Sequence, residues 1–226
     1  MPTDLLDALA TAPDVAGRLT GATGPDVRGL AIDVLRAVCA RTDPPGVAHP
    51  LGFVCVPLHR GADAGLCLHM WPAGAARHPA PTTSEVHAHS WDLLSWVVCG
   101  CLGNQIIAVR DDSEHPTHRL FRVVSEAGGD ELRATDRLVT CVPGRPEWTR
   151  AGRPYTIPAG SFHATATPPD GHAASLVLAR TRPGAADLSL GGLGLDSHRV
   201  HRQASPPGAT LDAARAVLAQ MLDETP

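Results

Sequence analysis

The chain has 226 residues, 43% of them hydrophobic and 19% charged, with a formal net charge of -4 and a sequence pI near 6.3. This composition is typical of globular domains and excludes a disordered chain, whose apolar content is too low to form a core. All 19 basic residues are arginines, and they are scattered among acids. The sequence therefore lacks the clustered positive charge of a nucleic-acid-binding face.

Two helices are predicted near the start of the chain, over residues 4–11 and 26–40, where apolar residues recur at the spacing of one helix face. Asp26 is the predicted N-cap of the second, because its carboxylate can accept hydrogen bonds from free N–H groups of the first turn. We expect residues 1–48 to form a helical prelude.

From Leu51 onward the pattern changes to short apolar runs rich in Val, Ile and Leu and broken by Gly and Pro. Such runs predict many short strands, which favour a sandwich or a barrel. The sequence Gly128-Gly129-Asp130 predicts a hairpin turn between two of them. The predicted strands are 51–58, 65–71, 84–89, 93–99, 104–109, 118–125, 131–142, 153–157, 161–167 and 174–181.

The last part of the chain is expected to be a loop followed by a helix. Residues 183–208 are rich in Gly, Pro and Ser and show little periodicity, whereas residues 211–222 repeat apolar side chains at helical spacing behind Thr210 as a cap. We therefore expect one domain over residues 1–226, with its strands in residues 50–182 and a loop and C-terminal helix in residues 183–226.

Cysteine usage and the start of the chain predict a cytoplasmic protein. The six cysteines, at positions 39, 55, 67, 99, 101 and 141, lack CxxC spacing. This argues against a zinc ribbon or a disulfide framework and favours buried, reduced thiols. The sequence has no apolar run of about 18 residues, and its first residues do not read as a secretory leader, so no membrane partner is expected.

The most informative segment runs from Glu85 to Gly100 and carries two histidines one residue apart. Side chains alternate along a strand, so His87 and His89 share a face. Their Cα atoms would lie roughly 6.5–7 Å apart. Both imidazoles can therefore reach one ion at about 2.0–2.2 Å. Taken alone, the pair is equally consistent with two packed or solvated histidines.

A second segment, residues 155–163, ends in a Pro-x-Gly-x-x-His turn. Pro158 fixes its own φ angle and Gly160 accepts a positive φ, so the chain can turn tightly into the strand that bears His163. The turn is therefore expected to aim His163 inward.

The two segments resemble the conserved motifs of the cupin superfamily, G-x5-HxH-x3,4-E-x6-G and G-x5-PxG-xx-H-x3-N. The matching residues are His87, His89 and Gly100 in the first motif and Gly152, Pro158, Gly160 and His163 in the second. The resemblance implies a mainly β fold, the cupin double-stranded β-helix or jelly-roll barrel, with N-terminal helices and a C-terminal helix. It also implies a metal ion held by His87, His89 and His163.

Two positions depart from these motifs. Leu93 stands where the first motif has its acidic ligand, and Thr167 stands where the second has Asn. Asp92 lies next to Leu93 but has the opposite strand parity, so it is expected in a turn or as an acceptor for a histidine N–H rather than as a ligand. We therefore expect a site of three histidines.

Among cupins, three histidines are similar to the Fe(II) sites of thiol, diketone and some ring-cleaving dioxygenases, and the layout is closest to cysteine dioxygenase-like proteins. The resemblance implies an Fe(II)-dependent oxidoreductase that acts with O2 on a small organic acid, thiol or diketone. It also assigns substrate carboxylate binding to Arg60, although a surface arginine before a turn explains this residue equally well. The Ser-x-His-x-Tyr relay of those proteins has no counterpart, and the only tyrosine is Tyr155.

Two other functions remain open. With Zn²⁺ or Ni²⁺, the same three histidines would suit a Lewis-acid isomerase, lyase or condensation enzyme. A cupin that binds a small ligand without turnover would need no catalytic metal chemistry. The resemblance further implies a homodimer formed through the edges of the barrel.

Several other residues are candidates for the inner wall. Counting in steps of two from His89 predicts that the inward-facing side chains are Leu93, Ser95, Val97, Cys99 and Cys101. Cys99 is expected to be a packed thiol, and His69, which shares a face with Cys67 and Trp71, is a pocket-lining candidate. The aromatic residues expected to form a dry mouth, or to pack as core, are Trp91, Trp96 and Phe162.

Overall fold

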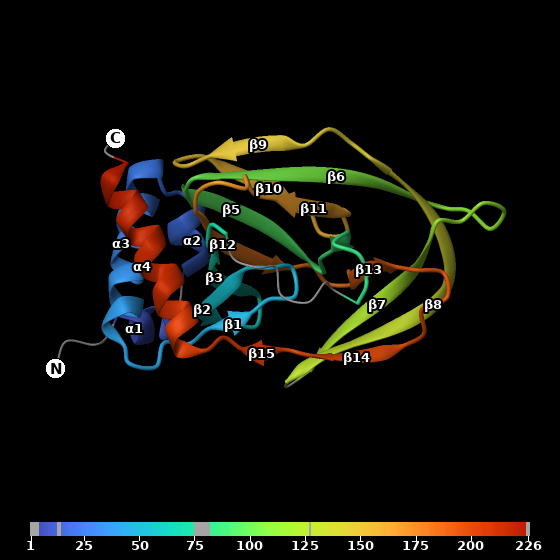
Figure 1. Ribbon diagram of the computed structural model, residues 1–226, viewed down its shortest axis with the longest axis horizontal. Helices are drawn as coiled ribbons and strands as arrows, with labels where there is room; N and C mark the ends of the chain where they lie inside the picture. The colour runs from blue at the N-terminus through green and yellow to red at the C-terminus, as the bar shows by residue number, and fades with distance from the viewer. Residues whose placement is uncertain (1–4, 13–14, 75–81, 127, 225–226) are drawn as a thin grey trace.

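The protein is mainly β, with two antiparallel sheets and helices toward both ends of the chain (Figure 1). The computed structural model describes residues 5–12, 15–74, 82–126 and 128–224. Its helices are α1 (Leu5–Thr11), α2 (Val15–Thr20), α3 (Gly24–Ala40) and α4 (Pro207–Asp223). No helix in these ranges combines the length and the apolar character that crossing a bilayer requires.

The first sheet has seven strands, in the order β10 (Pro154–Ile157), β5 (Trp91–Cys99), β12 (Ala173–Thr181), β3 (Ala64–Trp71), β2 (Val54–Arg60), β1 (Val47–Ala48) and β15 (Gln203–Ala204). The second has eight, in the order β14 (His198–His201), β8 (Gly129–Pro143), β7 (His118–Glu126), β13 (Asp187–Gly191), β4 (His87–Ala88), β11 (His163–Ala166), β6 (Cys101–Asp111) and β9 (Glu147–Arg150). An additional pairing of β6 with β8 joins the ladders of the second sheet into a ring.

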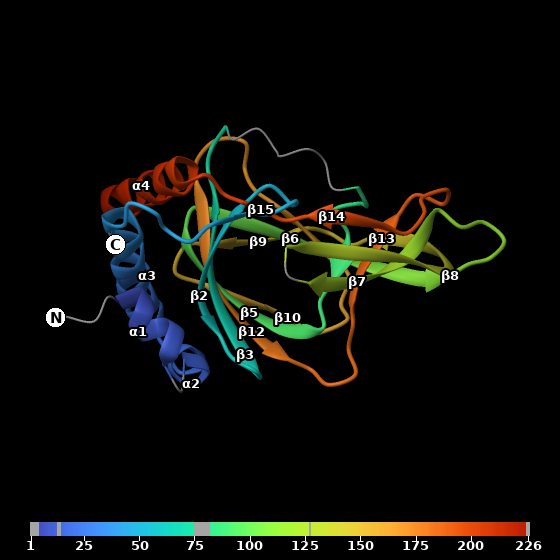
Figure 2. The same ribbon diagram turned by 90° about the horizontal axis from the view of Figure 1, so that it is seen from below.

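The helices cover the outer face of the seven-stranded sheet (Figure 2). Helix α3 contributes five buried apolar side chains to this interface, Val27, Ala31, Val34, Leu35 and Val38. Strand β3 meets them with Leu66, Leu68 and Met70, which are fully buried. Because side chains alternate along a strand, its intervening residues point to the other face of the sheet. The largest core cluster thus lies outside the sheet, and the inner face is left to line a cavity.

The expected helix starts are wrong in two places. Thr23 is the N-cap of α3, and Asp26 accepts hydrogen bonds from the Thr23 N–H at 3.1 Å and from its hydroxyl at 2.6 Å. A Thr three residues before an acid forms such a capping box, so Asp26 belongs to the first turn. Helix α4 starts at Pro207 after Pro206, and Thr210 is buried within it. Helix α2 was not predicted from the sequence.

The expectation of an irregular loop over residues 183–208 is also wrong, because this segment contains β13, β14 and β15. Strand β13 is hydrogen-bonded between β7 and β4, which are far away in sequence. A strand of this kind forms because of its neighbours in the fold, and its own short sequence does not predict it. The predicted hairpin is confirmed, with Gly128 at a φ of 90° in the turn that joins β7 to β8, but Gly129 and Asp130 already belong to β8.

Gly100→Ala should destabilise the protein more than Gly160→Ala. Both glycines have a positive φ, which costs alanine about 1–2 kcal/mol. Only at Gly100, between β5 and β6, would the new Cβ meet another group, the His172 carbonyl oxygen at 2.2 Å, whereas at Gly160 it meets nothing within 4 Å. We expect Gly100→Ala to lower the free energy of unfolding by about 3 kcal/mol or more in urea titrations. Equal losses would mean that the β5–β6 turn relaxes freely.

Candidate metal centre

Three histidines predicted from two distant segments meet at one point in the second sheet. His163 begins β11 and lies directly opposite His87 of β4, while His89 follows β4. The ring centroids are 4.3 Å apart for His87 and His163 and 5.2 Å apart for His89 and His163. One nitrogen of each ring lies within 4.8 Å of the others, so the group can hold a metal ion.

Backbone carbonyls and a stacked ring fix the orientation of these imidazoles. The Nδ1–H of His87 donates to the Glu85 carbonyl at 2.9 Å, and that of His163 donates to the Ser161 carbonyl at 3.1 Å. With the proton held on Nδ1, the Nε2 lone pair is the one that remains for a metal. His89 is stacked on Trp91, with ring centroids 3.9 Å apart and planes 16° apart.

The turn that presents His163 is tied to the HxH segment by main-chain donors. The Gly160 N–H donates to the His89 carbonyl at 2.8 Å, and the Ala159 N–H donates to the Asp92 carboxylate at 3.0 Å. Asp92 also forms an ion pair with Arg182. Of the two roles expected for Asp92, the structure agrees with the turn role: its carboxylate accepts a hydrogen bond from the turn and not from a histidine N–H, and it is not grouped with the three histidines.

Burial keeps the three histidines neutral. Loss of hydration lowers the pKa of His87 and lowers that of His89 well below its ordinary value, and the neighbouring imidazoles lower the pKa of His89 further. Burial, with His87 nearby, lowers the pKa of His163 from about 6.5 to about 3. A neutral imidazole has no proton to lose before it binds a metal, so this donor set suits a divalent transition ion at neutral pH.

The centre opens onto a cavity of about 400 Å³, whose lining includes His87, His89 and Trp91 from the site and Arg60 from the end of β2. An irregularity between Pro57 and His59 shifts the β2–β3 register, so that Arg60 lies opposite Gly65. Directly paired residues share a face, which places Arg60 on the side of the sheet that Cys55 faces. The guanidinium makes no ion pair with any residue that the structure describes.

The predicted inner wall is only partly correct. Leu93, Ser95 and Val97 are buried, whereas Cys99 packs in the core shared with the helices, because the β5–β12 register shifts beside it. Its side chain is fully buried, as expected for a packed thiol, and burial raises its pKa to about 12. Cys101 is half-buried beside a different cleft, and Trp96 also packs toward the helix-facing core.

Of the aromatic residues expected at the mouth, only Trp91 lines the cavity. Phe162 packs in a separate apolar cluster with Leu120, Val139 and Leu190. A position next to a ligand in sequence therefore does not predict which wall a side chain joins, because neighbours on a strand face opposite ways.

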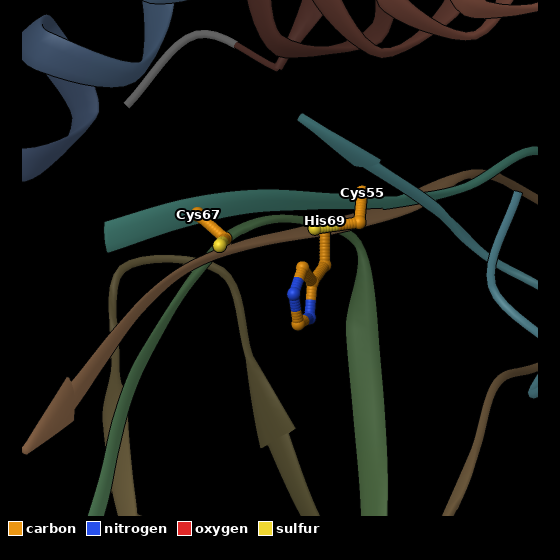
Figure 3. A group of neighbouring side chains, drawn as sticks. All are labelled: Cys55, Cys67 and His69. Carbon is orange, nitrogen blue, oxygen red and sulfur yellow. The ribbon is translucent and has the colours of Figure 1, made fainter. Parts of the chain in front are cut away.

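A second group of metal-binding side chains was not predicted. It consists of Cys55 on β2 and Cys67 and His69 on β3 (Figure 3). His69 lines the cavity as predicted, and so do both cysteines. The neighbouring Cys55 thiol and the His69 ring lower the pKa of Cys67, while burial opposes this shift. Cys67 and His69 were recognised as sharing a face, but the place of Cys55 depends on the β2–β3 register.

Comparison with protein-family models finds no match for this chain, and comparison with curated proteins finds none either. The case for a function therefore depends on the residues of the site.

The metal-free protein should lose stability as the pH falls below about 6.5. The unfolded chain binds protons at His163 from that pH downward, whereas the folded chain does so only near pH 3. Each such histidine contributes up to about 1.4 kcal/mol per pH unit within this window.

Urea unfolding of the metal-free protein at about pH 7 and about pH 5 measures this loss. We expect this loss of unfolding free energy between the two pH values to be smaller in His163→Gln, by roughly the contribution of one histidine. Phe162→Leu, which alters the neighbouring residue without removing a titrating group, should keep the wild-type difference. A His163→Gln variant with the full wild-type difference would contradict the neutral, buried state of His163.

Proposed function

We propose that this chain is a cupin-type metalloenzyme that binds one Fe(II) ion through His87, His89 and His163 and oxidises a small organic acid, thiol or diketone with O2. The proposal includes the fold: a double-stranded β-helix flanked by the helices. Two antiparallel sheets, with the HxH and PxG segments adjacent in one of them, support this assignment.

The observation that carries the proposal is the neutral donor set. Three imidazoles converge, and no carboxylate of the described residues is grouped with them. When bound, Fe(II) would keep its full positive charge and open positions, which suit an anionic chelating substrate together with O2. The protein's own part is to fix the rings: carbonyls hold the Nδ1 protons of His87 and His163, and Trp91 covers one face of His89.

The cavity supports a small anionic substrate. Its volume of about 400 Å³ lies at the lower end of the range of ligand pockets, roughly 300–1,000 Å³. Arg60 lines it and can bind a carboxylate through two parallel N–H donors. Arg202 lines it as well, but its guanidinium is engaged with Asp130 at 2.8 Å. We therefore assign substrate anchoring to Arg60.

Protein purified without chelators should contain iron, and O2 consumption with a panel of small acids, thiols and diketones should depend on it. His163→Ala should abolish both iron retention and O2 uptake, because two imidazoles leave the ion weakly held. His115→Ala, which alters an exposed histidine in a loop, is the matched control and should change neither.

Other outcomes would replace the proposal. Zinc or nickel that is bound at the three histidines and lost in His163→Ala, with substrate conversion that consumes no O2, would assign a Lewis-acid isomerase, lyase or condensation enzyme. A protein that binds a small acid without converting it and holds no metal at the three histidines would be a ligand-binding cupin.

Arg60→Met should raise KM for a carboxylate substrate by about 10- to 100-fold, the equivalent of about 1.5–3 kcal/mol for hydrogen bonds to a charged group. The turnover rate at saturating substrate should change far less, because the arginine binds a group remote from the reacting atoms. Arg137→Met, which alters an exposed arginine paired with Asp111, is the control and should leave KM unchanged. An unchanged KM in Arg60→Met would show that Arg60, an exposed residue at the rim of the cavity, does not anchor the substrate.

A further inference from the structure

The cavity has a second cluster of donor atoms on the wall that comes from the other sheet. Cys55 lies on β2 directly opposite His69 of β3, and Cys67 lies two residues before His69. The two β3 residues therefore share a face, and the β2–β3 register brings Cys55 to the same face. Figure 3 shows the His69 ring extending away from the strand, with the sulfur of Cys55 beside the base of its side chain and the sulfur of Cys67 to one side.

The spacing of these donors fits a single ion. The two sulfur atoms and one imidazole nitrogen all lie within 4.8 Å of one another. Around a tetrahedral zinc ion, with bonds of about 2.3 Å to sulfur and about 2.0–2.1 Å to nitrogen, neighbouring donors lie about 3.5–3.8 Å apart. A change of about 1 Å, within reach of side-chain rotation about χ1, would bring the three donors to this separation.

The surroundings of these side chains hold the donors in place. Cys55 is buried, whereas Cys67 and His69 are half-buried where they meet the cavity. The His69 ring packs against two aromatic rings that also contact each other, with its centroid 4.4 Å from Phe53 and 6.0 Å from Trp71. These contacts restrict the imidazole to a narrow range of orientations, as ligands of a metal site require.

The choice of donors selects the kind of metal. Two thiolates and one imidazole form a soft set that favours zinc or copper(I) over magnesium or calcium. Three protein ligands would leave a fourth tetrahedral position for a ligand from the cavity, which all three side chains line. Two thiolates would also neutralise the charge of a divalent ion beside the three-histidine centre.

We propose that Cys55, Cys67 and His69 form a second metal site, for a zinc-type ion, in the same cavity as the three-histidine centre but on the opposite sheet. The site does not depend on the redox function proposed above. A protein whose three-histidine centre binds nothing would still hold an ion here.

The test uses cobalt(II) as the probe, added without oxygen to the full-length, metal-free protein after reduction of all six cysteines. Thiolate ligands give cobalt an intense near-ultraviolet charge-transfer absorption that imidazole ligands alone do not give. We expect this absorption to saturate after one equivalent binds at the cysteine site, with two equivalents bound in total. Added zinc should abolish the absorption by displacing the cobalt.

Variants separate the two sites. Cys67→Ser and His69→Ala should each lose the charge-transfer absorption and one bound equivalent while the other equivalent remains, which also shows that the variant is folded. His163→Ala should keep the absorption. Cys101→Ser, which alters a half-buried cysteine beside a different cleft, is the control and should bind cobalt as the wild type does.

Two results would overturn the proposal. One is the absence of thiolate absorption when cobalt is added to fully reduced wild-type protein. This result overturns the proposal even if Cys55 and Cys67 form a disulfide when the reductant is withheld. The other is an absorption that persists in both Cys67→Ser and His69→Ala.

Discussion

A main-chain hydrogen bond from Gly160 to the carbonyl of His89 determines whether the candidate centre exists. It joins two segments that are distant in sequence, and the neighbouring contact between Ala159 and Asp92 prevents the turn from rotating about that bond. Because β11 follows this turn, its first residue falls opposite His87. The third imidazole is thus positioned by backbone geometry, which requires a glycine at one point and a carboxylate at another.

Residues that act through local backbone geometry could be predicted from the sequence. The HxH pair, the Pro158 and Gly160 turn and the amphipathic stripe of α3 each follow from alternation, from a restricted φ angle or from helical spacing, and the structure agrees with all three. The three histidines could be grouped in advance because two short motifs limited the possible positions of the third.

Features that depend on register could not be predicted. Arg60 faces the cavity only because a bulge after Pro57 changes the parity of β2, and Cys99 turns toward the helices because of a similar shift beside β12. Cys55 joins its cluster through pairing with β3, and β13 exists because β7 and β4 flank it. Each of these features depends on how the strands pair and in which register. The local sequence pattern does not predict either.

Side chains alternate along β3, so the two faces of this strand contact different parts of the protein. Leu66, Leu68 and Met70 pack against the helices, while Cys67 and His69 on the other face line the cavity. Because Cys67 and His69 do not belong to the core that packs on the helices, we expect substitutions of these residues to change the cavity with little effect on that core. Such a division favours rapid evolutionary change of the ligand specificity of the cavity. It also makes the cavity-facing side of β3 a suitable place to engineer new metal-binding side chains.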